Sequence, residues 1–156
     1  METEDTVKIS TTIDQLPDLA GSTFGPSSWM QITQEDVNAY ADVSRDHNPI
    51  HVDPEAAARS PFGRTVVHGY LTLSLVVPLM AEVFSVTDMG TGMNYGLDRL
   101  RFPAPVPVGG RVRLRGEITE TTPIENGNQI KVSVIFEVEG STKPACAAEM
   151  ILRYYK

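Results

Sequence analysis

The spacing of apolar residues changes near Gly90, and the change predicts helices before that point and strands after it. Over residues 34–44, apolar positions recur at intervals of three or four, which is typical of a helix with one buried face. A shorter helix is expected over residues 53–58, because Asp53 stands at the capping position and Pro54 at the first helical position.

The longest apolar segment, residues 67–84, has no polar face at helical spacing. A helix of this kind must be buried on most of its sides. Pro78 removes one backbone hydrogen bond, so we expect the helix to bend or break near Ser74. Its most apolar stretch, residues 71–80, is too short to span a bilayer, and no membrane partner is expected.

Beyond Gly90, apolar residues alternate with polar or small ones, as in strands of a sheet with one covered face. Asn126-Gly127 and Gly140 separate consecutive runs in the manner of tight turns, so neighbouring strands should be antiparallel. The expected strands lie at 28–32, 93–102, 112–121, 129–139 and 145–155. This order indicates an α+β fold whose antiparallel sheet wraps around the long buried helix.

The length of 156 residues, with glycines and prolines scattered, favours one compact domain. We place that domain at residues 25–156, behind an N-terminal leader, residues 1–24, with a possible short helix over 12–20. A net charge of -7 and the absence of a Lys/Arg cluster argue against nucleic acid as a partner. The acidic N-terminus lacks a signal-peptide pattern, and Cys146 is the single cysteine, so a cytoplasmic protein without disulfides is expected.

The polar connection over residues 45–64 is long for a compact domain, and such connections often carry function. Asp46 and His51 stand five residues apart across Pro49, so a carboxylate and an imidazole can converge on one water molecule. His51 accepts a proton only as a neutral ring whose other nitrogen is held by a carboxylate or a carbonyl. A second interpretation is that the two residues cap and brace the loop. In either case Asn48 is expected to bond the backbone of its own turn.

Three groups of residues carry a family resemblance. The first is Tyr40-Ala41-Asp42-Val43-Ser44-Arg45-Asp46-His47-Asn48-Pro49-Ile50-His51, and the second is His68-Gly69 at the start of the apolar helix. The third is Asn94-Tyr95-Gly96-Leu97 with Arg101-Phe102-Pro103-Ala104-Pro105-Val106-Pro107-Val108-Gly109. The first two resemble the motifs of the MaoC-like, R-specific enoyl-CoA hydratases, and the third is similar to the nodulation-protein-N-like branch of that family. The resemblance extends from about Trp29 to Tyr154.

The resemblance implies the hot-dog fold, in which an antiparallel sheet wraps around a long helix, and a homodimer with sites near the subunit interface. It implies (R)-specific hydration of trans-2-enoyl thioesters to 3-hydroxyacyl thioesters, or the reverse dehydration. Asp46, His51 and Gly69 would be the catalytic residues, with a Gly69 backbone N–H binding the thioester oxygen, and Asn48 and His68 would support the site. No cofactor or metal is implied, because coenzyme A or an acyl carrier enters as part of the substrate.

Several alternatives stay open. A non-catalytic acyl-thioester-binding module and a thioesterase would both fit the same fold. Gly69 also fits a role in close packing of the helix, and His68 fits a structural role. The chain departs from the family pattern at Arg45, where glycine is usual. This arginine could pair with Asp46 and lower its basicity, meet a substrate phosphate, or point outward.

Overall fold

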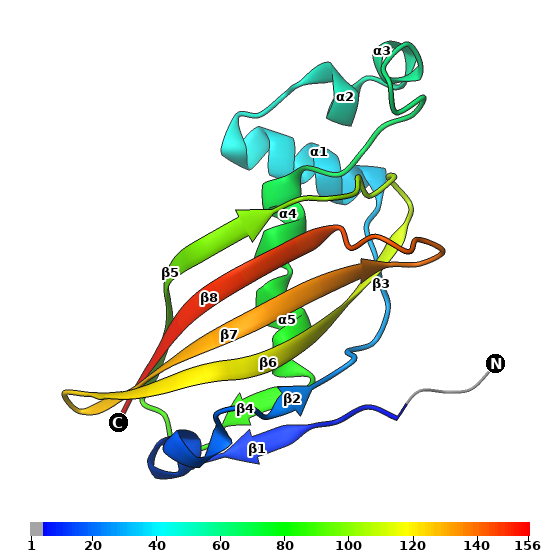
Figure 1. The fold of residues 1–156 in the computed structure, drawn as a ribbon. Coiled ribbons are helices and arrows are strands. Elements are labelled where there is room, and N and C mark those ends of the chain that lie inside the picture. The colour runs from blue at the N-terminus through cyan, green and yellow to red at the C-terminus, as the bar shows by residue number, and fades with distance from the viewer. Residues whose placement is uncertain (1–4) are drawn as a thin grey trace.

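Figure 1 shows a curved sheet with a central helix lying against one of its faces. The computed structural model describes residues 5–156. The strands of the sheet follow the spatial order β2, β6, β7, β8 and β5, with β3 pairing a second part of β6, and every pairing in it is antiparallel. The strand bounds are β2 (Thr23–Phe24), β3 (Met30–Gln31), β5 (Thr91–Arg101), β6 (Arg111–Ile124), β7 (Gly127–Val138) and β8 (Cys146–Tyr155).

Alternation along the strands sets which side of the sheet meets the helix. In β7, the apolar residues Ile130, Val132, Val134 and Phe136 are fully buried, and the residues between them face outward. The four predicted strands after Gly90 are therefore confirmed, with bounds that shift by three residues or fewer. The strand predicted at 28–32 is shorter, since only the two residues of β3 pair.

The central helix is broken, as Pro78 predicts, into α4 (Gly69–Ser74) and α5 (Val76–Ala81) with Leu75 between them. Leu79 of α5 is fully buried in the core. The helix was expected to be buried on most of its sides. In a single copy of the chain this expectation is only partly right, because Tyr70 is 66% and Val77 is 59% exposed. One face of the helix thus remains open to solvent.

The N-terminal part packs on the same core, at the end of the sheet far from the start of α4 (Figure 1). A 3-10 helix, η1 (Ile13–Leu19), forms within the predicted 12–20 segment. Strand β1 (Ile9–Thr11) pairs in parallel with β4 (Phe84–Val86), a pairing that the sequence did not predict. A domain boundary at residue 24 stays a prediction.

Three short helices cluster near the other end of the sheet: α1 (Gln34–Ser44), α2 (Pro49–Val52) and α3 (Pro54–Ala58) (Figure 1). The bounds of α1 agree with the predicted 34–44, and Asp53 caps α3 by accepting from the N–H groups of Glu55 and Ala56. Helix α2 was not predicted. Among the described residues, no helix is long and apolar enough to cross a membrane.

The single cysteine lies inside the core. Cys146 is fully buried at the start of β8, and burial raises the pKa of its thiol to about 11. A thiol with so high a pKa is almost entirely protonated near neutral pH, which makes it a poor nucleophile. Cys146 is therefore an inert residue of the core.

Candidate active site

The connection between α1 and α4 covers residues 45–68, and a hydrogen bond joins its beginning, at Asp46, to its last residue, His68. The imidazole Nε2–H of His68, the residue before α4, donates to the backbone carbonyl of Asp46 at 2.9 Å. Within the loop, Asp46 Oδ1 accepts from the N–H of Asn48, and Asn48 Oδ1 accepts from the N–H of Ile50. Asn48 therefore bonds the backbone of its own turn, as predicted, and fixes the backbone between Asp46 and α2.

His51 is held in one tautomer by a backbone group. Its Nδ1–H donates to the carbonyl of Val66 at 2.6 Å, and the residue is only 8% exposed. Because Nδ1 carries the hydrogen, Nε2 of the neutral ring keeps its lone pair and can accept a proton. The requirement for a carbonyl on the other ring nitrogen is met. The sequence offered no signal for Val66, since the contact uses its backbone.

His68 lies against His51 and is almost completely buried. Its ring stacks on that of His51 with centroids 3.8 Å apart, and the ring of Tyr40 lies 4.9 Å from it. Burial lowers the pKa of His68, its hydrogen bond to the Asp46 carbonyl opposes this shift, and the neighbouring His51 adds to it. We therefore expect a neutral His68 in the folded protein.

The lowered pKa of His68 leads to a stability prediction. Below its ordinary pKa of 6.5, the unfolded chain takes up a proton that the folded state resists. Acid therefore favours unfolding, and the free energy of unfolding should fall as the pH drops below about 6.5. Urea titrations from pH 7.5 to 5.5 measure this slope, which His68→Phe should reduce. An equal slope in His68→Phe would contradict the prediction.

Asp46, His51 and His68 each place one donor atom within 4.8 Å of the other two. This spacing fits a small bound molecule, and by type the set could hold a divalent cation. His68 Nε2 is bonded to the Asp46 carbonyl, and its Nδ1 is buried without a hydrogen-bond partner. The Asp46 carboxylate and His51 Nε2 suit proton transfer with a water held between them.

A pocket of about 380 Å³ opens beside His51. Its wall includes Gly69, Thr72 and Phe102, together with residues of the loops around 62–67 and 103–106. A Cβ on Gly69 would lie 3.0 Å from the ring of Phe102, so glycine permits a close aromatic contact here. Gly69 also starts α4, where the first N–H groups have no partner inside the helix. The geometry is compatible with both interpretations of Gly69. Phe102 was not singled out as a functional residue from the sequence.

Arg45 ends α1 in the left-handed conformation, with φ 66° and ψ 13°. Glycine is the residue that adopts this conformation at least cost, which explains physically why glycine suits the position. Within residues 5–156, Arg45 forms no ion pair with Asp46. The structure thus favours neither the pairing of Arg45 with Asp46 nor its contact with a substrate phosphate.

The strained backbone of Arg45 gives a second prediction. Arg45→Gly should raise the free energy of unfolding by about 0.5–1 kcal/mol, because relief of strain outweighs the added freedom of the unfolded chain. Arg45→Ala, which keeps a Cβ, should change it little. Chemical denaturation and kinetic assays of both variants test this, with activities expected within about twofold of the parent. Loss of activity in Arg45→Ala as large as in His51→Ala would place the guanidinium in the reaction.

The fold and the site together define a class of protein. An antiparallel sheet wrapped around a central helix is the arrangement of a hot-dog protein, and an Asp and His pair lies near the start of that helix. Residues 16–140 match the MaoC like domain family, and the chain belongs to that family.

Relatives agree over nearly the whole chain. The 3-hydroxyacyl-thioester dehydratase Z of Mycobacterium tuberculosis is 49% identical over 147 residues, which cover 92% of this chain and 97% of that protein. Nodulation protein N of Rhizobium leguminosarum is 39% identical, covering 87% and 86%. Among solved structures, the (R)-hydratase from A. caviae involved in PHA biosynthesis superposes with a TM-score of 0.70 at 26% identity, covering 85% of this chain and 94% of that one. The predicted hot-dog fold and family membership are confirmed.

Proposed function

We propose that this protein catalyses the (R)-specific hydration of trans-2-enoyl thioesters, or the reverse dehydration of 3-hydroxyacyl thioesters. One observation carries the proposal: a carboxylate oxygen of Asp46 and a ring nitrogen of His51 lie within 4.8 Å of each other beside a pocket, and the bond of His51 Nδ1 to Val66 leaves Nε2 able to accept a proton. The similarity to a 3-hydroxyacyl-thioester dehydratase supports the same reaction class.

The mechanism follows from what these groups can hold. Asp46 and His51 bind one water molecule, and one of them takes its proton as the oxygen attacks C3 of the enoyl group. The electron pair of the double bond moves toward C2 and the thioester oxygen, and the same assembly returns a proton to C2. A backbone N–H at Gly69, at the positive end of α4, stabilises the negative charge that develops on the thioester oxygen.

The decisive assay uses crotonyl-CoA. We expect loss of the enoyl absorbance and formation of the (R)-3-hydroxy product, identified by chiral chromatography. Release of a free thiol without hydration would identify a thioesterase instead. Binding of crotonyl-CoA with neither product would identify a non-catalytic acyl-thioester-binding module.

No cofactor enters this proposal, because the acyl carrier is part of the substrate. We place the reaction in the cytoplasm. The buried Cys146 supports this placement, since it needs no oxidising compartment.

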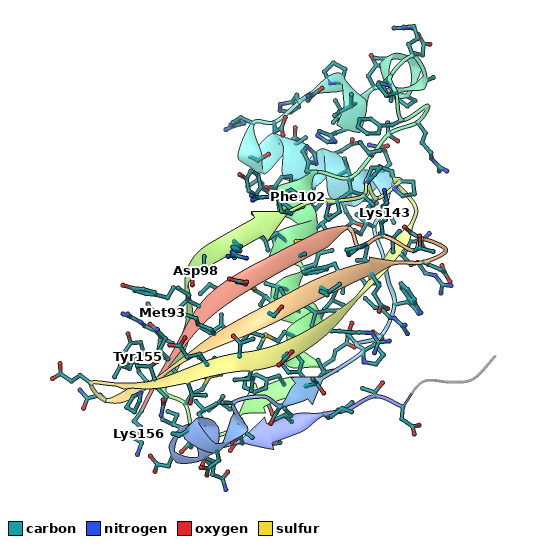
Figure 2. The ribbon with its side chains drawn as sticks, viewed as in Figure 1. Met93, Asp98, Phe102, Lys143, Tyr155 and Lys156 are labelled. Atoms are coloured by element: carbon teal, nitrogen blue, oxygen red, sulfur yellow. The ribbon has the colours of Figure 1, made fainter. Side chains whose placement is uncertain are left out.

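We further propose that the protein is a homodimer formed through β5. This strand is the edge of the sheet, and its exposed apolar residues include Met93, Tyr95 and Leu97. Figure 2 shows Met93 and Asp98 along this outer edge and Phe102 at its end, beside α4. An unpaired edge with apolar side chains is a surface that a second copy would cover. The open face of α4 and α5, with Tyr70 and Val77, adds further uncovered apolar residues.

Light scattering at micromolar concentration should therefore give twice the chain mass. Leu97→Lys should shift the protein toward monomer, because it places a charge in the apolar contact. Val43→Lys is the matched control, since Val43 is 85% exposed on α1 and lies outside the proposed interface. A parent protein that is monomeric in this experiment would exclude the proposed dimer.

A further inference from the structure

Gln34 is a half-buried residue whose side chain reaches the backbone that carries His51. It stands at the first position of α1, directly after the capping residue Thr33. An N–H on its Nε2 donates to the backbone carbonyl of His51 at 2.8 Å. Its Oε1 accepts from the hydroxyl of Thr65 at 3.0 Å. The amide of Gln34 therefore bridges two parts of the connection between α1 and α4 that are distant in sequence.

The ring of His51 joins the same two parts. His51 Nδ1–H donates to the carbonyl of Val66, the residue after Thr65, at 2.6 Å. Val66 N–H donates in turn to the carbonyl of Ile50, the residue before His51, at 3.0 Å. The amide of Gln34 is thus a third link between these two backbone segments. A shift of either segment would disturb the bond that selects the tautomer of His51.

The hydrogen bonds of Gln34 determine which way round its amide lies. The His51 carbonyl can only accept, so the atom that faces it is the amide nitrogen. The same nitrogen donates to Asn38 Oδ1 at 3.0 Å, one turn further along α1. Both N–H groups and the oxygen of the amide therefore have partners. A polar side chain that is fully engaged in this way is rigid and holds its partners in defined positions.

The first turn of α1, from which Gln34 projects, is itself fixed. Asp36 N–H donates to Thr33 Oγ1 at 3.2 Å, and Thr33 N–H donates to the Asp36 carboxylate at 2.8 Å, which together form a capping box. Val37 is fully buried and anchors the helix in the core. Helix α2, which carries His51, packs beside α1 (Figure 1). The amide of Gln34 therefore ties His51 to an anchored helix.

We infer that Gln34 is a positioning residue for His51. Its amide holds the backbone of His51 against the segment at Thr65, so that the ring keeps its tautomer and directs Nε2 to the water. The inference rests on the proposed function, in which His51 acts on that water. Gln34 does not line the pocket beside His51, so it acts through His51 and not by touching the substrate. A neutral imidazole takes up either tautomer unless a partner fixes one, and only the Nδ1–H form suits this role.

Gln34→Met tests this role, because methionine matches glutamine in length and suits a helix but has no N–H donor. The kcat for hydration of crotonyl-CoA should fall about 10-fold, with KM changed less than about twofold, because a displaced reacting group slows the chemical step. Gln34→Glu should lose at least as much, since its carboxylate cannot donate to the His51 carbonyl. Gln31→Met is the matched control and should keep its activity. Gln31 of β3 donates to the carbonyl of Gly109 at 3.1 Å, outside the connection.

A second measurement observes the tautomer of His51 and does not depend on turnover. In protein with ¹⁵N-labelled histidine, long-range ¹H–¹⁵N correlation spectra distinguish a ring protonated at Nδ1 from one protonated at Nε2. The spectra are recorded at slightly alkaline pH, where histidine is neutral. The signals that disappear in His51→Ala assign the ring. We expect only the Nδ1–H form in the parent and in Gln31→Met, and both forms in Gln34→Met.

Thr65→Val is a second variant, which removes one bond of the Gln34 amide without altering α1. It should show the same two effects at smaller size, about 3-fold in kcat, because the bond to the His51 carbonyl remains. This variant decides the question if circular dichroism shows that Gln34→Met does not fold. Unchanged kcat and tautomer in Thr65→Val would then overturn the positioning role.

The remaining outcomes separate the inference from the proposed function. An unchanged kcat in a folded Gln34→Met, or a tautomer of His51 that stays as in the parent, would overturn the positioning role. A lower Tm alone would make Gln34 a structural residue and overturn it as well. A parent that hydrates no enoyl thioester, but whose His51 tautomer responds to Gln34→Met, would reject the proposed function and leave the role of Gln34 standing.

Discussion

Asp46→Asn and His51→Ala should each lower the rate of enoyl-CoA hydration by about 10²-fold or more, in proteins that remain folded. Asp46→Asn removes the negative charge, and His51→Ala removes the Nε2 lone pair that the bond to Val66 leaves free. Because both groups act on one water molecule, the double variant should lose little more than the worse single variant. Steady-state kinetics with crotonyl-CoA, alongside circular dichroism, measure this.

The same loop offers matched controls. Asp42 and His47 pair with each other at 2.9 Å on the exposed side of the chain, so Asp42→Asn and His47→Ala change the same residue types without touching the pocket. Both should keep nearly full activity, since exposed pairs contribute little. A double variant of Asp46 and His51 whose loss equals the product of two large single losses would refute the shared water. Full activity in either single variant would remove that residue from the site.

Gly69→Val should also lower hydration by about 10²-fold, the scale of losing one donor to a developing oxyanion. The variant keeps the N–H but blocks the approach of the thioester oxygen to it. Its side chain also meets the ring of Phe102, which lies 3.0 Å from the position of a Cβ. The loss alone therefore does not distinguish the two interpretations of Gly69.

Phe102→Ala separates them, because it opens the space that the valine needs. If Gly69 serves the substrate, Gly69→Val should lower kcat/KM by about the same factor in the Phe102→Ala variant as in the parent. Recovery of activity in the double variant would show that glycine serves only the packing of α4 against Phe102. The coupling energy from the four kcat/KM values is the quantity to compare.

Features with a local pattern could be predicted from the sequence. Alternation along residues 129–139 gave strand β7, because one buried face imposes a period of two. Pro78 gave the break between α4 and α5, since proline cannot complete the backbone bonding. Asp46 and His51 could be proposed together because they stand five positions apart with a proline between them.

Features made by distant contacts could not be predicted. Strands β1 and β4 have three residues each, too few for a period to show, and they pair only because the rest of the fold brings them together. The carbonyl of Val66 that holds His51 belongs to the backbone, which every residue has. The exposed Val77 of α5 also shows that apolar composition does not reveal which side a neighbour covers.

The attachment of the connection from α1 to α4 has a consequence for how the fold opens. Strands β6, β7 and β8 bond along most of their length, whereas the connection from α1 to α4 is tied to the rest of the fold by scattered bonds, among them Val67 N–H to the Val106 carbonyl and Val108 N–H to the Thr65 carbonyl. Segments with few buried contacts open locally at a lower free energy than the whole protein. Amide protons of this connection therefore exchange with solvent sooner than those of the central strands. The proposed reactive groups, Asp46 and His51, lie on a part of the chain that substitutions can reshape without rebuilding the sheet.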